Sequence, residues 1–180
     1  MFTLDKVMPW GRSFDEYCRM FALTQGDLKG RILGCADGPA SFNAEATRRG
    51  SSVVSCDPIY RLSTFDLRAR IAATYDKILE QTRTNQDEFI WTAIKSPDEL
   101  GRLRLATMDV FLEDYDAGKR TGRYFDAELP QLPFVDHSFD LAVCSHFLFL
   151  FIQNSWGRSF TSRRFSNFAA SQRRFVCSRY

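Results

Sequence analysis

The residues of this 180-residue chain with the clearest potential for ligand chemistry are a glycine-containing turn and an acidic residue that follows it. The turn is Gly34-Cys35-Ala36-Asp37-Gly38-Pro39, and Asp57 lies 19 positions after Gly38. A glycine turn between a strand and a helix allows the backbone to approach a ligand closely. A carboxylate at the end of the next strand suits the two hydroxyls of a ribose. The pair therefore predicts a site for an adenosine-containing ligand.

A nicotinamide dinucleotide is one such ligand, but the turn matches its fingerprint poorly. That fingerprint is G-x-G-x-x-G, whereas this chain has Gly34, Ala36 and Pro39 at the three glycine positions. Proline has no backbone N–H to donate to a pyrophosphate. An NAD-binding protein is therefore the less favoured alternative.

The segments around the turn have the pattern of a βαβ unit. Apolar runs predict strands at 31–35 and 52–56, and the composition between them predicts a helix at 40–49. This order implies a parallel sheet with a right-handed crossover. A capping-box spacing predicts a further helix at 13–23, within an N-terminal helical segment that spans 1–29.

A helical insertion is expected at 61–118, before the third strand. Apolar residues keep helical spacing over two long stretches there, and Ser96-Pro97 gives the second stretch an N-cap and a proline in its first turn. A shorter helix is expected between them at 87–94. This is more chain than one crossover needs, so we expect the insertion to lie over one end of the sheet.

Three stretches, in order, resemble the successive motifs of class I S-adenosylmethionine-dependent methyltransferases. They are Arg31-Ile-Leu-Gly-Cys-Ala-Asp-Gly-Pro-Ala-Ser-Phe42, Val53-Val-Ser-Cys-Asp-Pro58 and Leu132-Pro-Phe-Val-Asp-His-Ser-Phe-Asp-Leu-Ala-Val143. Strands are expected at 124–128 and 139–144. The resemblance covers about residues 30–151 and implies an α/β, Rossmann-like methyltransferase fold with strand order 3-2-1-4.

The resemblance also implies roles for residues that would bind S-adenosylmethionine. The turn would lie beside the methionine part, and Asp57 would bind the ribose hydroxyls. Glu128 would face the adenine amino group, with Asp126 as the alternative, and the Leu129 backbone amide would face the ring nitrogen. The cofactor-binding residues implied in this way are Gly34, Ala36, Asp37, Gly38, Asp57, Glu128, Leu129 and Ser145.

The region of methyl transfer would lie beyond the fourth strand, beside Cys144, Ser145 and His146. A sulfonium methyl is already activated, so a general base is needed only if the acceptor must first lose a proton. His146 is the candidate for that role. Aromatic side chains of the insertion, such as Tyr75 or Trp91, would line the acceptor pocket.

The composition limits the classes of partner and compartment. The chain has 24 basic and 22 acidic residues, and a net charge of +2 gives no general case for binding nucleic acid or a membrane. The five cysteines form no C-x-x-C pair, so no metal site is predicted. No signal peptide or membrane-spanning run is recognisable, which favours the cytoplasm. The expected partner is a small-molecule methyl acceptor.

The last part of the chain differs in kind from the rest. The final 40 residues contain no Asp or Glu, and the family-like pattern stops after Phe151. We interpret 152–180 as a non-native or disordered basic tail, such as a shifted reading frame would produce. A solvated tail and a nucleic-acid or membrane arm are the alternatives.

This interpretation bears on activity and assembly. A domain truncated there would leave its fourth strand at a sheet edge, and we expect marginal stability or oligomerisation through that edge. We do not expect a methyltransferase truncated in this way to be fully active. The alternative hypothesis is a non-catalytic adenosine-binding or interaction remnant.

Overall fold

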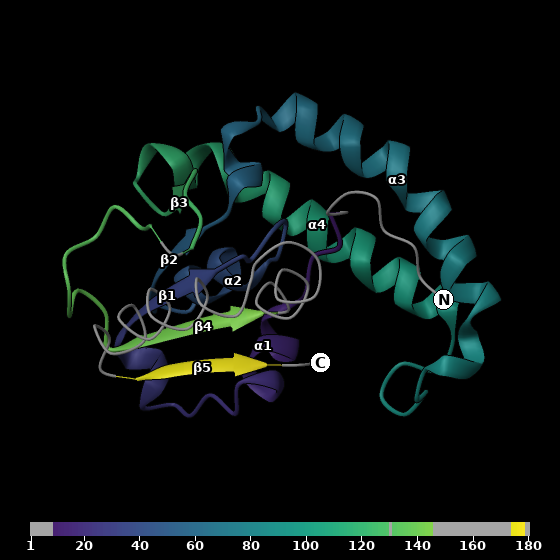
Figure 1. Ribbon diagram of the computed structural model, residues 1–180, viewed down its shortest axis with the longest axis horizontal. Coiled ribbons are helices and arrows are strands. Elements are labelled where there is room, and N and C mark those ends of the chain that lie inside the picture. Colours follow the sequence, from purple (N-terminus) through teal and green to yellow (C-terminus); the bar gives the residue numbers. More distant parts are fainter. Residues whose placement is uncertain (1–8, 130, 146–173, 179–180) are drawn as a thin grey trace, which may run out of the picture.

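A computed structural model describes residues 9–129, 131–145 and 174–178, and shows an α/β, Rossmann-like fold (Figure 1). A parallel sheet has the order β3-β2-β1-β4-β5, so the predicted order of the first four strands is confirmed. The strands are β1 Arg31–Cys35, β2 Ser52–Cys56, β3 Tyr124–Phe125, β4 Leu141–Ser145 and β5 Phe175–Ser178.

Four α-helices accompany these strands in the described part of the chain. They are α1 Phe14–Met20, α2 Phe42–Arg48, α3 Thr64–Thr84 and α4 Pro97–Arg120. Three short 3₁₀ helices, η1 Asp27–Lys29, η2 Pro58–Arg61 and η3 Gln86–Glu88, lie between them. The predicted cap of α1 is present, because Ser13 and Glu16 form a complete capping box.

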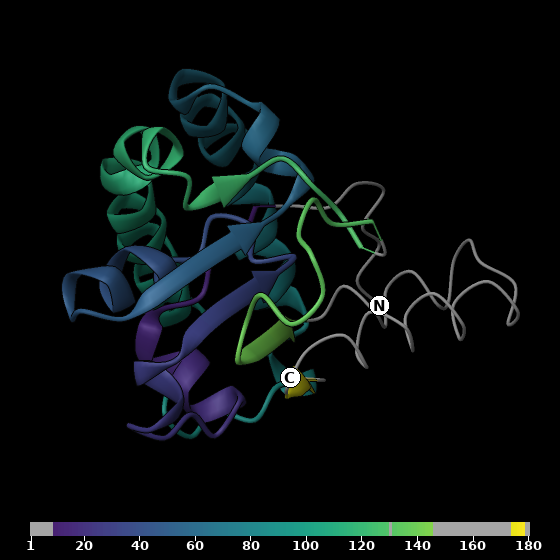
Figure 2. The ribbon, with the colours of Figure 1, turned by 90° about the vertical axis from the view of Figure 1, so that its left-hand side faces the viewer.

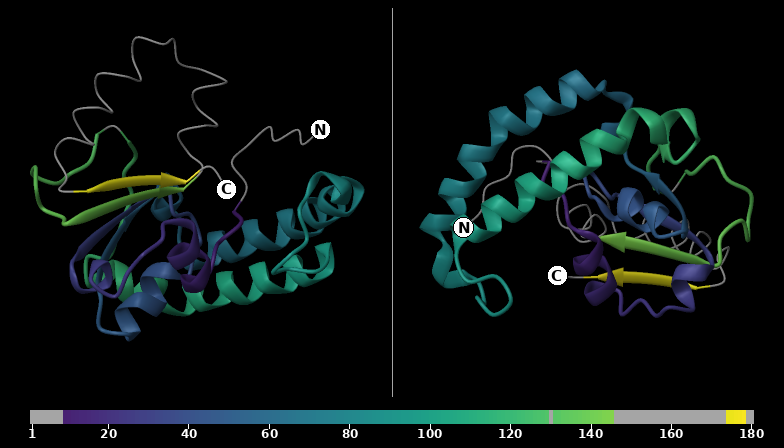
Figure 3. Two further views of the ribbon diagram at one scale, coloured as in Figure 1. Left: turned by 90° about the horizontal axis from the view of Figure 1, so that it is seen from below. Right: turned by 180° about the vertical axis from the view of Figure 1, so that it is seen from behind.

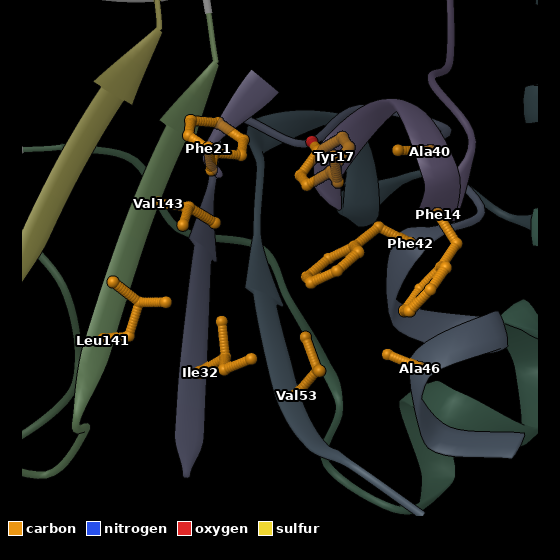
Figure 4. Close-up of a cluster of buried hydrophobic side chains, with 10 residues drawn as sticks. All are labelled: Phe14, Tyr17, Phe21, Ile32, Ala40, Phe42, Ala46, Val53, Leu141 and Val143. Carbon is orange, nitrogen blue, oxygen red and sulfur yellow. The ribbon is translucent and has the colours of Figure 1, made fainter. Parts of the chain in front are cut away.

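Helices α1 and α2 cover one face of the sheet (Figure 2). Phe14 and Tyr17 of α1 lie on either side of Phe42 of α2, and the rings of Tyr17 and Phe42 stack with centroids 4.5 Å apart. The strands contribute the side chains that point from the sheet toward these rings (Figure 4). These side chains are Ile32, Val53, Leu141 and Val143. The apolar faces of the two helices and of the sheet thus pack together in one layer.

The opposite face is covered by Phe125 at the end of β3 and by the segment that connects β3 to β4. Phe125, Ala127, Leu129, Leu132 and Phe134 pack on the side chains that point to this face. Those side chains include a row of buried cysteines on adjacent strands, since Cys35 is in register with both Cys56 and Cys144. The same register continues to Cys177 of β5.

The expected helical insertion is present as an antiparallel pair, α3 and α4, that extends beyond the sheet (Figure 3). Helix α4 contacts α2 and leads into β3, so it is also the crossover helix that joins β2 to β3. The insertion therefore packs beside α2 and not only over one end of the sheet. The prediction of a short helix at 87–94 is wrong, because only the 3₁₀ turn Gln86–Glu88 forms there.

Two further expectations need correction. The third strand was expected over 124–128, but it contains only Tyr124 and Phe125. The fourth strand is not at the edge of the sheet, because Phe175–Ser178 pairs with it in parallel over four residues. This short strand comes from the segment interpreted as a tail, and the rest of that segment, apart from Arg174, lies outside the described residues.

Candidate functional site

The candidate site lies where the first three parallel strands end and the loops that follow them meet. The decisive contact is between the turn after β1 and the acidic residue after β2. The backbone N–H of Gly38 donates a hydrogen bond to Oδ2 of Asp57 at 2.9 Å. The two residues selected for their spacing therefore meet at this edge.

The backbone at Gly38 explains why glycine stands there. Its φ of +54° lies in the left-handed region, which strains residues with a side chain. A Cβ would have room, since the nearest atom, Oδ2 of Asp57, would be 4.0 Å away. Conformation rather than crowding is thus what favours glycine at this position.

Asp57 is fixed by its own local structure as well as by the turn. It caps η2, because its Oδ1 accepts a hydrogen bond from the Ile59 N–H at 2.8 Å. Burial raises the pKa of Asp57, and the negative charges of Glu128 and Asp126 add to this effect. The two backbone hydrogen bonds act in the opposite direction and favour the carboxylate.

A tyrosine that the sequence argument did not select supports the same turn. The Tyr60 hydroxyl donates a hydrogen bond to the Gly38 carbonyl at 2.8 Å, so the turn is held on both sides of Gly38. The Tyr60 backbone carbonyl in turn accepts hydrogen bonds from the Tyr115 hydroxyl at 2.7 Å and from the Lys119 ammonium at 2.8 Å. The only signal for Tyr60 in the sequence is its place three residues after Asp57.

A small pocket opens beside these residues. Its cavity volume is about 10 Å³, roughly room for one water molecule and far below the usual size of a ligand pocket, so it is a narrow hollow in this structure. Its walls are mostly apolar, with one acidic residue. The lining residues are Cys35, Ala36, Cys56, Pro58, Ala127, Glu128, Leu129 and Leu132. Three predicted site residues, Ala36, Glu128 and Leu129, are among them.

The alternative acidic residue lies outside this lining. Asp126 is exposed and reaches the site only through the effect of its charge on Asp57. Glu128 is exposed too, but it forms part of the pocket wall, and its carbonyl accepts a hydrogen bond from the Gln131 N–H at 3.1 Å. Of the two candidates for the acidic residue that would face adenine, only Glu128 lines the pocket.

Asp37 does not line the pocket, and its side chain points into the protein, whereas the place of the turn beside the methionine part stays a prediction. Its carboxyl is buried and accepts hydrogen bonds from the hydroxyls of Tyr17 and Ser55. The carboxyl also fills the space next to Gly34, where any Cβ would collide with it. Gly34 therefore makes room for Asp37.

The residues expected near the methyl group are only partly described. Ser145 ends β4 at the same edge of the sheet, and Cys144 before it is buried. His146 lies outside the described residues.

The two aromatic candidates for an acceptor pocket do not line the pocket described above. Tyr75 lies against Trp10, with ring centroids 6.0 Å apart. Trp91 lies against Phe89, and its indole N–H donates to the Gln86 carbonyl at 2.7 Å. Both residues therefore have structural partners on or near the α3–α4 pair.

The described part of the chain shows neither a metal site nor a membrane-spanning helix. No group of three or more His, Cys, Asp or Glu side chains there is arranged to hold a metal ion. None of the helices described combines the length and the apolar character that crossing a membrane requires.

Comparison with known proteins gives one relative. The chain is 33% identical over 142 residues to an uncharacterized protein of Methanocaldococcus jannaschii, and the match covers 78% of this chain and 63% of that protein. The chain thus spans less than two thirds of the relative's length. No protein-family profile matches the chain. No solved structure matches it either.

Proposed function

We propose that the chain binds S-adenosylmethionine and is a methyltransferase for a small-molecule acceptor. The observation that carries the proposal is the contact between Gly38 and Asp57 at the carboxyl edge of a parallel sheet. This edge is where open α/β sheets bind their ligands. The chain spans 63% of its relative's length, and the described residues bear on the cofactor site, so the acceptor is proposed only as a class of molecule.

Asp57 has the free capacity that a ribose needs. Each of its oxygens accepts one backbone N–H, from Gly38 or from Ile59. A carboxylate has about four lone-pair positions, so about two remain for hydroxyl donors. The adjacent hollow has apolar walls of Ala36, Pro58 and Leu132, a lining whose chemistry suits one face of a purine ring. These residues fit an adenosyl group.

Charge favours this cofactor over a dinucleotide. Glu128 and Asp126 act on Asp57 as negative charges, so the mouth of the site is acidic. Such a field attracts a sulfonium cation and repels a pyrophosphate. The start of α2, where a dinucleotide would place its phosphates, also holds Glu45, whose Oε1 accepts a hydrogen bond from the Ser41 hydroxyl at 2.5 Å.

When bound, S-adenosylmethionine would supply a methyl group that its sulfonium centre already activates. The side chains would then contribute mainly by orienting the reactants. In this arrangement Asp57 holds the ribose hydroxyls, Glu128 accepts from the adenine amino group, and the turn at Gly38 lies along the rest of the cofactor. We assign no general base among the described residues.

Calorimetric titration with S-adenosylhomocysteine tests the cofactor site. We expect the wild-type protein to bind it and Asp57→Asn to bind it about ten- to a hundredfold more weakly, since a hydrogen bond to a charged group contributes about 1.5–3 kcal/mol. Asp76→Asn, an exposed acidic residue on α3 outside the pocket, is the matched control and should bind like the wild type.

Other ligands in the same titration separate the alternatives. Tighter binding of NAD than of S-adenosylhomocysteine would replace this proposal with a dinucleotide site. Equal affinity for adenosine and S-adenosylhomocysteine would favour a non-catalytic adenosine-binding module. An absence of binding heat for S-adenosylhomocysteine in a folded wild-type protein would refute the proposal.

A further inference from the structure

The turn that contacts Asp57 has a strained backbone conformation that other contacts must stabilise. Ala36 has a φ of +57° and Gly38 a φ of +54°, so Asp37 lies between two residues in the left-handed region. For alanine this conformation is strained and persists only where neighbouring contacts impose it. The backbone directs the Asp37 side chain inward, where the residue is only 7% exposed.

Hydrogen bonds from two other elements hold that side chain. The Tyr17 hydroxyl of α1 donates to Oδ1 of Asp37 at 2.8 Å, and the Ser55 hydroxyl of β2 donates to Oδ2 at 2.6 Å. Ser55 is itself positioned, since its oxygen accepts a hydrogen bond from the Asn43 amide of α2 at 3.1 Å. The Tyr17 ring is packed in the apolar cluster of Figure 4, so the donor has little freedom to move.

We propose that Asp37 is a positioning residue of the adenosyl site: held between Tyr17 and Ser55, its carboxyl fixes the Ala36–Gly38 turn in the shape that meets the ligand. The proposal rests on the proposed function for the identity of the ligand. It makes α1 part of the site, although α1 contributes no residue to the pocket lining.

The charge state of the anchor follows from its surroundings. Burial raises the pKa of Asp37 to about 7, and the nearby charge of Asp57 adds to this, while the hydrogen bonds from Ser55 and Tyr17 lower it. No Lys or Arg is among the described groups that act on this carboxyl. The ionisable or polar groups that face Asp37 are Tyr17, Cys35, Ser55, Cys56, Asp57, Tyr60 and Tyr124.

Opening of the turn is therefore linked to pH. An aspartate exposed to water has a pKa of about 3.9, so the opened turn gives up the proton more readily than the closed one. As pH rises from about 4 to 7, opening should become up to about tenfold more favourable for each pH unit. Above pH 7 both forms are ionised, and the dependence should level off.

Hydrogen exchange of the Ala36 amide measures this opening without any ligand. That N–H donates to the Cys56 carbonyl at 2.8 Å and not to the Asp57 side chain. In the wild type we expect the protection factor to fall as pH rises from 5 to 7 and then to level off. In Asp37→Asn, which has no charge to gain at this position, the fall with pH should be much smaller, and what remains belongs to Asp57, whose pKa is also raised by burial.

Two tyrosine variants show whether the effect belongs to Asp37. Tyr17→Phe removes a hydrogen bond that lowers the pKa of Asp37, so the levelling-off should move to higher pH. Tyr60→Phe, the matched control, removes the hydrogen bond to the Gly38 carbonyl and should lower protection equally at every pH. An unchanged profile in Tyr17→Phe, or the wild-type profile in Asp37→Asn, would overturn the proposal.

The same variants are then titrated with S-adenosylhomocysteine at pH 8. Asp37→Asn should bind at least as tightly as the wild type, and Asp37→Ala, which lacks the anchor, at least tenfold more weakly. Equal affinity in Asp37→Ala and the wild type would also overturn the positioning role. If no protein binds the ligand while the exchange profiles are as expected, the proposed function fails but the anchoring of the turn stands.

Discussion

Replacing Asp37 by asparagine should stabilise the whole protein at neutral pH, although it removes a buried residue's charge. The carboxyl is buried, and the nearby charge that acts on it, that of Asp57, has the same sign. Asparagine has nearly the same shape and keeps an acceptor for Tyr17 or Ser55, but it never ionises. The substitution therefore isolates the energetic effect of one buried carboxylate.

The size of the effect follows from the difference between two pKa values. The pKa is about 7 in the folded protein and about 3.9 in the unfolded chain. Between these values the folded state binds more protons, so folding stability due to this group falls as pH rises and is constant above pH 7. From pH 5 to pH 8 the loss is roughly 2–3 kcal/mol, at about 1.4 kcal/mol for each pH unit below the folded value.

Urea unfolding of both proteins at pH 5, 6, 7 and 8 measures the difference directly. Other carboxylates, such as Glu16 and Asp114, have lowered pKa values and affect both proteins equally, so they cancel in the comparison. The stability of Asp37→Asn relative to the wild type should rise with pH up to about 7 and then stay constant. A constant difference, or one that falls with pH, would refute the assignment of a buried, protonated Asp37.

Two structural predictions concern the helices around the site. Arg104→Ala should destabilise the protein by about 3–5 kcal/mol because it leaves Glu16 buried without its bidentate partner, and the double variant Glu16→Gln, Arg104→Met should lose less in the same urea assay. Gly118→Ala should cost about 1–3 kcal/mol because its Cβ would press into the Tyr124 ring. Gly26→Ala should leave the thermal midpoint nearly unchanged, because its Cβ would make only an ordinary contact, 3.5 Å from the Thr24 hydroxyl.

Local patterns along the chain were sufficient to predict the centre of the site. The strands at 31–35 and 52–56 form where apolar runs placed them, and their parallel pairing brings the turn and Asp57 to one edge. The prediction succeeds because parallel strands in one βαβ unit must end on the same side. The contact of Gly38 with Asp57 is a consequence of the βαβ topology. The strand-helix-strand order in the sequence was sufficient to predict that topology.

The orientation of Asp37 could not be predicted in the same way. Whether its side chain faces a ligand or the interior depends on the left-handed backbone of Ala36, and alanine carries no sequence signal for that conformation. Its partners, Tyr17 and Ser55, lie 20 residues before and 18 residues after it. Tyr17 stands in no motif, and Ser55 lies in the Val53–Pro58 stretch without any signal that its hydroxyl binds Asp37. Long-range hydrogen bonds of this kind are decided by packing, not by local spacing.

The fifth strand was missed for a related reason. Phe175–Ser178 is a short apolar segment in a region rich in Arg and Ser, and its own propensity is too weak to mark it as a strand. It forms a strand in the sheet by pairing with β4, in register from Ala142–Phe175 to Ser145–Ser178. Pairing with an existing edge can order a segment that no periodicity identifies.

Helix α4 of the insertion is linked by hydrogen bonds to the edge of the sheet where the proposed ligand site lies. Tyr115 and Lys119 of α4 donate hydrogen bonds to the Tyr60 carbonyl, and the Tyr60 hydroxyl donates to the Gly38 carbonyl. On the other side, Arg104 of α4 binds Glu16 of α1, the helix that also presents Tyr17 to the turn. Helix α4 therefore supports the turn from two directions. A segment that looks in sequence like an addition to the domain is, in the folded protein, part of what gives its proposed ligand site a fixed shape.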